Sequence, residues 1–289
     1  MTTLSQPQTA SNGTPLGTRS LSPVIGATVE GVDLSGPLSD GVIAQIRQAL
    51  DEHLVIFFED QQLTPVQQRD FAKRFGELHV HPLYPGTDEV REIAVLAYDE
   101  NRQGHNNSWH TDVTFIETPP QASILYAEQV PEVGGDTIWV NSYAAYEALS
   151  EPLKRLASEL RAVHDFSKAF KPERFRAYGI EERAAQAYAE NPPVSHPVVR
   201  TNVATGRKAL FVNATFTSSI EGLSQLESDA LLKLFFDHLV RPEFQVRWRW
   251  KPNTVAFWDN RWTQHYALSD YFPHPRRVRR ATILGDRPV

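Results

Sequence analysis

Two histidines and one aspartate constrain this sequence more than any other feature. His110 and Asp112 stand two residues apart, and His265 follows far downstream. Because side chains alternate along a strand, His110 and Asp112 can point into one cavity while Thr111 points away. The third ligand must come from another strand, so the fold has to bring distant segments together. Two histidines and one carboxylate are the ligand set typical of non-haem Fe(II) oxygen chemistry, the alternative being a hydrogen-bonded core histidine.

Short strands separated by glycine and proline make up the middle of the chain, which favours a mainly β core. Residues 244–250 alternate strictly, with apolar side chains on one face and polar side chains on the other. The N-terminal part predicts further elements: a strand at 24–29, a helix from the cap Ser39 to about 52, a buried strand at 54–58 and a helix beginning at Thr64-Pro65.

Three regions follow from composition along the chain. Residues 1–20 contain almost no bulky apolar side chain, which predicts a mobile tail, and residues 21–289 are expected to form a single domain. Between about 142 and 190, helical patterns at 144–163 and 172–190 interrupt the β core. An insertion of this length is either an active-site lid or a packed helical flank.

The charge balance and the absence of cysteine exclude several classes of protein. With 29 Lys and Arg against 35 Asp and Glu, the formal charge is −6, and we expect no nucleic-acid partner. No apolar run reaches the length of a membrane span, so we expect a soluble, cytoplasmic protein. Zero Cys excludes disulfides, thiolate metal sites and a cysteine nucleophile.

Four arginines cluster near the C-terminus, in residues 276–280. Such a cluster is usually solvated, but in a strand Arg276 and Arg280 share one face, while Arg277 and Arg279 share the other. One pair of guanidinium groups can therefore line a cavity. Because each guanidinium matches the oxygens of a carboxylate or sulfonate, the pair suggests two anionic small molecules.

Five motifs together resemble the Fe(II)- and 2-oxoglutarate-dependent dioxygenase superfamily, and within it the taurine/2-oxoglutarate dioxygenases. They are residues 75–82, 109–115, 134–137, 258–261 and 280–286, and the resemblance runs from about residue 21 to the end. It implies a double-stranded β-helix, the cupin-like jelly roll, with flanking helices and the helical insertion. It also implies Fe(II), 2-oxoglutarate and O2 as cofactor and cosubstrates.

The resemblance assigns roles to individual residues. His110, Asp112 and His265 would ligate Fe(II) as the catalytic centre, and Thr137 and Arg276 would bind the distal carboxylate of 2-oxoglutarate. The remaining residues would bind a sulfonate substrate: Arg280, His81 and the backbone of Val113 at the sulfonate, with Tyr84, Asn106, Phe170 and Phe216 shaping the rest of the pocket.

The implied reaction hydroxylates the carbon next to sulfur in an aliphatic sulfonate, with taurine as the first candidate, and yields sulfite, an aldehyde, succinate and CO2. Relatives of this kind are often oligomeric, so a homodimer or homotetramer is expected. The alternatives are the same chemistry on an alkyl sulfate ester or an aryloxyacetate, or a zinc or structural cupin without oxygen chemistry.

Two positions depart from the taurine enzymes. His105 stands where they have an acidic residue, and Ala169 stands where they have a serine. Asn106 would then be the one residue offering an oxygen to the ammonium group of taurine. The sequence therefore predicts only a modest preference for taurine over a sulfonate with a neutral tail.

Overall fold

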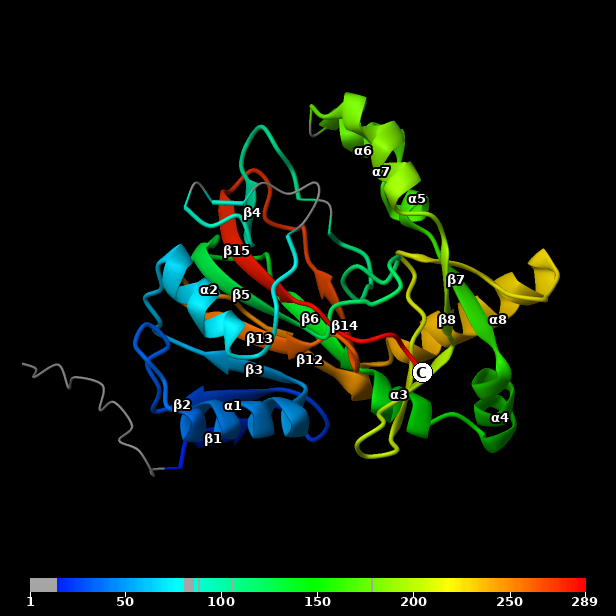
Figure 1. The fold of residues 1–289 in the computed structure, drawn as a ribbon, viewed down its shortest axis with the longest axis horizontal. Coiled ribbons are helices and arrows are strands. Elements are labelled where there is room, and N and C mark those ends of the chain that lie inside the picture. The colour runs from blue at the N-terminus through cyan, green and yellow to red at the C-terminus, as the bar shows by residue number, and fades with distance from the viewer. Residues whose placement is uncertain (1–14, 81–85, 88, 105, 178) are drawn as a thin grey trace, which may run out of the picture.

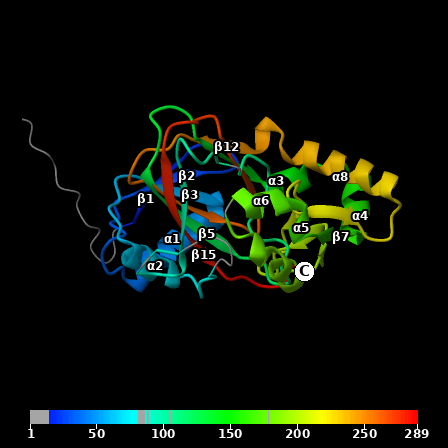
Figure 2. The ribbon, with the colours of Figure 1, turned by 90° about the horizontal axis from the view of Figure 1, so that it is seen from above.

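A computed structural model describes residues 15–80, 86–87, 89–104, 106–177 and 179–289. Two β-sheets pack face to face on one side of the molecule, and a mostly helical flank lies beside them (Figures 1 and 2). No helix among these residues is long and apolar enough to cross a membrane.

The larger sheet has seven strands, and all neighbours are antiparallel except β2 and β3, which are parallel. In spatial order they are β1 (Gly17–Ser20), β2 (Ala27–Glu30), β3 (Val55–Phe58), β13 (Val255–Asp259), β5 (Ala122–Gln129), β15 (Arg276–Ile283) and β4 (Ile93–Tyr98). The facing sheet has the order β12 (Gln245–Trp248), β6 (Thr137–Asn141) and β14 (Thr263–Ala267).

Aromatic side chains fill the space between these two sheets. Phe57 of β3 stacks on Trp248 of β12 with ring centroids 4.0 Å apart, and Trp139 of β6 meets the edge of Phe57 at 5.4 Å. Val246 and Trp248 are buried while Arg247 is exposed, as the alternation in this segment predicts. The expected jelly roll is confirmed.

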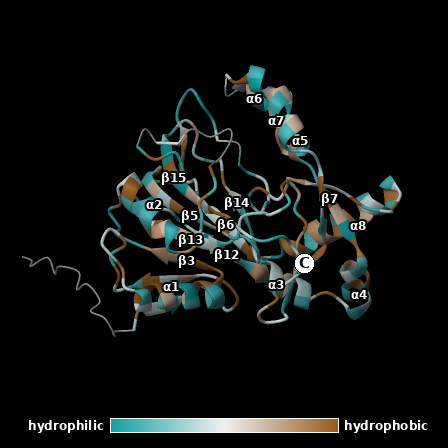
Figure 3. Cartoon of the chain, in the orientation of Figure 1, coloured by the Kyte–Doolittle hydropathy of each residue, from teal (hydrophilic) through white to brown (hydrophobic). Residues whose placement is uncertain are grey.

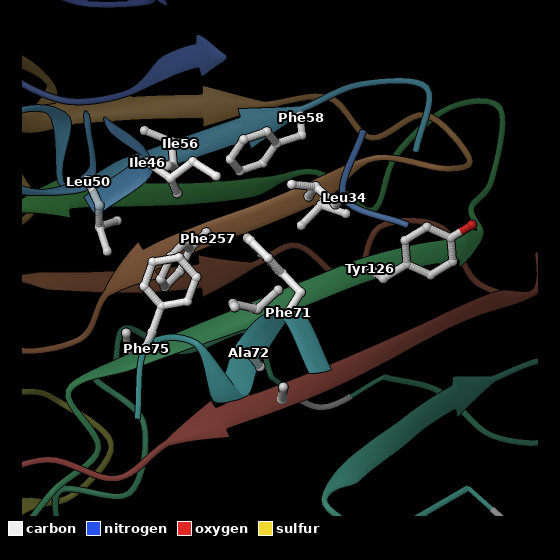
Figure 4. Close-up of a cluster of buried hydrophobic side chains, with 14 of the residues drawn as sticks. Leu34, Ile46, Leu50, Ile56, Phe58, Phe71, Ala72, Phe75, Tyr126 and Phe257 are labelled. Carbon is white, nitrogen blue, oxygen red and sulfur yellow. The ribbon is translucent and has the colours of Figure 1, made fainter. Parts of the chain in front are cut away.

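Two helices cover the outer face of the larger sheet. Helix α1 (Asp40–His53) begins at Ser39, whose side chain accepts a hydrogen bond from the Val42 amide, and α2 (Pro65–Lys73) begins with a capping box at Thr64. Figure 4 shows their apolar side chains meeting those of the sheet, Phe71 beside Phe257 among them. Along α1, hydrophobic and hydrophilic residues alternate in colour, as expected for a helix with one buried face (Figure 3). Both helices confirm the sequence prediction.

The flank contains more strand than the sequence predicts. The first helical pattern divides into α3 (Ser142–Glu147) and α4 (Glu151–Glu159), and its last residues form strand β7 (Arg161–His164). This strand lies between β8 (Val194–Pro197) and β11 (Thr217–Ile220), so interstrand pairing overrides the local helical pattern.

The second helical pattern is also interrupted. It forms α6 (Pro172–Ala177), the 3-10 turn η1 (Glu181–Arg183) and α7 (Ala184–Glu190), and the short helix α5 (Phe166–Ala169) precedes it. The break falls at Gly179, whose φ of 65° is left-handed. The rest of the flank comprises β9 (Val199–Thr201), β10 (Lys208–Leu210), α8 (Gln225–Leu239) and the 3-10 turn η2 (Pro242–Phe244).

The boundary of the N-terminal tail is corrected. Residues 17–20 were expected to be part of a mobile segment, yet they form β1, which pairs with β2 from Gly17↔Glu30 to Ser20↔Ala27. All four side chains are exposed, so the strand is held through its backbone and needs no apolar side chain. Residues 1–14 lie outside the described residues.

Candidate active site

The two sheets bring His110, Asp112 and His265 together. His265 lies in β14 and forms an isolated bridge with His110, with backbone N–O distances of 2.8 and 3.0 Å. The Nε2 atoms of His110 and His265 lie 3.8 and 3.9 Å from Asp112 Oδ1. One ligand atom from each side chain lies within 4.8 Å of the others, which is compatible with a shared metal ion.

The local backbone differs from the expected strand. His110 occupies the bridge, but Asp112 lies in the turn that follows, and Val113 has a left-handed φ of 54°. Thr111 does point away from the cluster, and its hydroxyl donates to the Thr263 carbonyl at 2.7 Å. The turn, rather than strand alternation alone, therefore directs Asp112 toward the two histidines.

The protonation states suit a divalent cation. The Nδ1 atom of His110 lies 2.7 Å from the Ser108 carbonyl, so it donates and leaves a lone pair on Nε2. Burial lowers the pKa of His110, and it lowers the pKa of His265 to about 3, so both imidazoles are neutral at pH 7. Among the described residues, none hydrogen-bonds His265 Nδ1. Two neutral imidazoles beside one carboxylate are the forms that bind metal.

Asp112 is held by hydrogen bonds on both carboxylate oxygens. Arg280 Nη1 donates to Oδ1 at 2.7 Å, and Ser123 Oγ donates to Oδ2 at 3.0 Å. Burial alone would raise the pKa of Asp112, but the positive charge of Arg280, together with the two nearby imidazoles and the Ser123 hydrogen bond, holds this pKa below its ordinary value.

A chain of buried polar groups continues behind Ser123. Asn260 Nδ2 donates to Ser123 Oγ at 2.9 Å, and Trp258 Nε1 donates to Asn260 Oδ1 at 2.9 Å. Sequence reasoning assigned these residues no role at the site. Trp258 and Asn260 lie in a recognised motif, whereas Ser123 gives no signal because it stands inside an apolar strand.

A first pocket lies beside the cluster, between the two sheets. Arg276 of β15 and Thr137 of β6 line it together with His110 and His265. Trp250 Nε1 donates to Thr137 Oγ1 at 2.9 Å, which orients this hydroxyl. Arg276 is buried, and among the described residues no carboxylate forms an ion pair with it. A buried guanidinium without a carboxylate partner indicates an anionic ligand.

A second pocket adjoins the first, and His110 and Arg280 line both of them. Its apolar walls include Val113, Phe115, Phe170 and Phe216. Phe115 and Phe216 have ring centroids 5.0 Å apart, and both pack with Phe170 in one buried cluster. Phe170 and Phe216 are therefore core residues and pocket walls at once. His81, Tyr84 and His105 lie outside the described residues.

Asn106 and Arg174 line the same pocket. Arg174 belongs to α6, and its Nη2 donates to Asn106 Oδ1 at 3.0 Å. The guanidinium carbon of Arg174 lies 4.7 Å from the ring centroid of Phe170. Sequence reasoning missed Arg174, because periodicity within a short helix does not indicate which face meets a pocket. Ala169 packs against the phenylalanine cluster.

Comparisons with known proteins agree with this geometry. Residues 17–282 match the family described as "Taurine catabolism dioxygenase TauD, TfdA family". An alpha-ketoglutarate-dependent sulfate ester dioxygenase from Pseudomonas putida is 43% identical over 271 residues, covering 92% of this chain and 88% of that protein. An alkylsulfatase from Acinetobacter baylyi is 39% identical, covering 93% of this chain and 84% of that protein.

Solved structures show the same architecture. A taurine dioxygenase from Burkholderia xenovorans superposes with a TM-score of 0.82 at 38% identity, covering 96% of this chain and 91% of that chain. AAD-2, solved in complex with Mn(II) and N-oxalylglycine, gives a TM-score of 0.79 at 30% identity, covering 94% of this chain and 98% of that chain.

Proposed function

The chain belongs to the TauD, TfdA dioxygenase family, and from this premise we propose that it oxidises an aliphatic compound carrying a sulfonate or sulfate group. It is a 2-oxoglutarate-dependent dioxygenase that uses Fe(II) and O2. One observation carries the substrate proposal. Arg276 and Arg280 are both buried on one face of β15 beside the His–Asp–His cluster, where Arg276 lines the first pocket and Arg280 lines both the first pocket and the second.

His110, Asp112 and His265 would hold the Fe(II). Bound there, Fe(II) supplies the activation of dioxygen, with 2-oxoglutarate as the reductant. The fit is supported by two neutral imidazoles and an ionised carboxylate within 4.8 Å of one another. Ser123 and Arg280 orient the carboxylate, and the His110 Nδ1 hydrogen bond fixes the ring tautomer.

Arg276 and Thr137 would bind the distal carboxylate of 2-oxoglutarate. A buried guanidinium can donate two parallel hydrogen bonds to a carboxylate, and the Thr137 hydroxyl can add a third. The Trp250 hydrogen bond supports this role because it occupies the Thr137 oxygen as an acceptor and leaves its proton free to donate.

Arg280 would bind the sulfo group of the substrate. Its Nη1 already donates to Asp112, and among the described residues none accepts from its buried Nε, which supports a further anionic ligand. Val113, whose φ is left-handed, lines the same pocket, and its backbone amide would add a donor to the sulfo group. Binding there would hold the carbon next to the sulfo group beside the metal ligands and exclude bulk water.

The products differ between the two substrate classes. One O2 and one 2-oxoglutarate convert a sulfonate into an aldehyde and sulfite, or a sulfate ester into an aldehyde and sulfate, and each gives succinate and CO2. The names of the Pseudomonas and Acinetobacter relatives favour the sulfate ester. Taurine, a homo-oligomeric state and a cytoplasmic location stay predictions from sequence.

The test is an anaerobic mixture of protein, Fe(II) and 2-oxoglutarate with a panel of alkyl sulfates, alkanesulfonates, taurine and phenoxyacetate, to which O2 is then added. We expect one molecule of succinate for each molecule of sulfate or sulfite released. Succinate that depends on phenoxyacetate alone, or no substrate-dependent succinate at all, would exclude the sulfur substrate.

A further inference from the structure

We propose that Arg174 determines substrate specificity by making the pocket reject a cationic tail and accept an uncharged apolar one. The tail end of the pocket, which we define as Asn106, Phe170 and Arg174, is the part that would meet the tail when Arg280 holds the sulfo group. This inference rests on the function proposed above, and it makes alkyl sulfates and plain alkanesulfonates better substrates than taurine.

The position of Arg174 is the first observation. It lines the pocket together with Arg280, so a guanidinium stands at the tail end as well as at the sulfo end. The guanidinium carbon lies 4.7 Å from the ring centroid of Phe170 and is held there by a cation–π contact. An ammonium group entering this end would therefore approach a fixed positive charge.

The second observation concerns Asn106, the residue that was expected to accept a hydrogen bond from an ammonium group. Its Oδ1 accepts from Arg174 Nη2 at 3.0 Å, and its Nδ2 donates to Tyr98 Oη at 3.3 Å. Both ends of the amide are thus engaged within the protein. An ammonium group that used the second lone pair of the amide oxygen would lie next to the Arg174 guanidinium, so like charge opposes its binding there.

The other polar groups along the described pocket lining do little to offset the repulsion between Arg174 and an ammonium group. Ser108 and Thr215 share a hydrogen bond of 2.8 Å, and Thr215 Oγ1 also donates to the Trp109 carbonyl. Asp112 is the one carboxylate in this lining, and it is paired with Arg280. A cationic tail therefore meets like charge without a free carboxylate, whereas an alkyl tail packs against phenyl rings.

An alternative role for Arg174 is to bind an anionic tail, such as a second carboxylate. The guanidinium already contacts the Phe170 ring and the Asn106 oxygen. These contacts favour a structural role for Arg174, as a cation that closes the end of the pocket, rather than a ligand-binding role. Including 3-sulfopropionate in the substrate panel distinguishes the two roles, because an anion-binding Arg174 would make it the preferred substrate.

The experiment compares taurine with propanesulfonate, which has nearly the same length and a neutral tail. We expect wild-type kcat/KM for propanesulfonate to exceed that for taurine by about ten-fold or more, given like charges a few ångströms apart. Arg174→Gln should narrow this ratio by raising kcat/KM for taurine, and Arg174→Glu should reverse it. Isothermal titration calorimetry under anaerobic conditions, where no turnover occurs, should rank the affinities for taurine and propanesulfonate in the same way.

Arg176→Gln is the matched control. It removes an arginine from the same helix, where Arg176 is exposed and pairs with Glu173 at 3.1 Å, and it should leave the ratio unchanged. A wild-type preference for taurine, or an equal loss for both sulfonates in Arg174→Gln, would overturn the inference. If no sulfur compound supports succinate formation in the wild type, the proposed function fails instead.

Discussion

At the metal end of the pocket, each ligand side chain is held by a strand or by hydrogen bonds from strand residues, whereas the tail end is covered by short helices of the flank. His265 belongs to β14, and Asp112 is fixed by Ser123 of β5 and Arg280 of β15. Arg174 lies on α6, a helix of six residues. The sheets thus position the reacting groups, while a separate segment determines which tail can reach them.

The largest expected effect lies at the metal end. Asp112→Ala should abolish succinate formation and reduce binding of Co(II), used as a stable substitute for Fe(II), because it removes the one anionic ligand. His110→Ala and His265→Ala should have the same effects as Asp112→Ala. Asp237→Ala, which removes an exposed carboxylate on α8, serves as the control for Co(II) titration. Full turnover in any of the three ligand variants would contradict the assignment.

Substituting each cavity arginine in turn should distinguish the ligand that Arg276 binds from the ligand that Arg280 binds. Arg276→Ala should raise the KM for 2-oxoglutarate by about 10- to 100-fold, since a charge-assisted hydrogen bond contributes roughly 1.5–3 kcal/mol. Arg280→Ala should raise the KM for the sulfur compound instead. Steady-state kinetics with each ligand varied in turn measures this. If both variants lose only 2-oxoglutarate affinity, the division between the pockets is wrong.

A buried histidine connects the flank to the turn after Asp112. Nε2 of His196 lies 2.9 Å from the Thr114 carbonyl, and burial lowers the pKa of His196 to about 4. The unfolded chain, with an ordinary pKa near 6.5, binds more protons between these values, so stability is complete above about pH 6.5 and falls toward pH 4. The loss from this group is about 3 kcal/mol.

Urea unfolding of the metal-free protein from pH 7 to 4 measures this loss. His196→Gln keeps a donor for the Thr114 carbonyl but cannot be protonated in this range, so its unfolding free energy should depend less on pH. An identical pH dependence in the variant and the wild type would show that other groups carry the acid sensitivity.

The smallest effect is expected behind the metal ligands. Ser123→Ala removes the donor to Asp112 Oδ2 and leaves Asn260 Nδ2 without its acceptor, which should weaken Co(II) affinity by about ten-fold. Ser158→Ala, at an exposed helix position, is the control. Unchanged Co(II) affinity would show that Arg280 alone is enough to orient the carboxylate.

The same contrast explains what the sequence could predict. Strand alternation placed Arg276 and Arg280 on one face of a strand, and capping residues located the starts of α1 and α2. These signals act over a few residues, so they are readable locally. Arg174 gave no comparable signal, because its place in the pocket depends on how α6 packs against the phenylalanine cluster.

Long-range pairing accounts for the other differences. The helical pattern of residues 144–163 includes residues 161–163, but β7 forms there because β8 and β11 supply its partners from far along the chain. Ser123 stands inside an apolar strand, and its role depends on Asn260 and Asp112, which lie beside it only in the folded chain. Neither arrangement can be read from neighbouring residues.

The first five residues of β15, the strand that carries both cavity arginines, have a sequence that is symmetric about Val278. Residues 276–280 read Arg-Arg-Val-Arg-Arg, so a slip of one residue would still turn two arginines, Arg277 and Arg279, toward the cavity. They would stand two residues apart instead of four, and the two pockets could not each receive one. Alternation by itself therefore does not distinguish the active alignment from the inactive one.

From the opposite face of β15, Arg279 opposes one of the two possible slips, the one that would put Val278 in its place. It is buried, its Nε lies 3.2 Å from Glu128 Oε1, and its guanidinium donates to the Leu63 carbonyl. Gln68 of α2 in turn donates to the Arg279 carbonyl at 3.0 Å. Glu128 lines neither pocket, yet its ion pair with Arg279 would be lost if Val278 took the place of Arg279. The yield of correctly folded, active molecules therefore depends on residues outside both pockets.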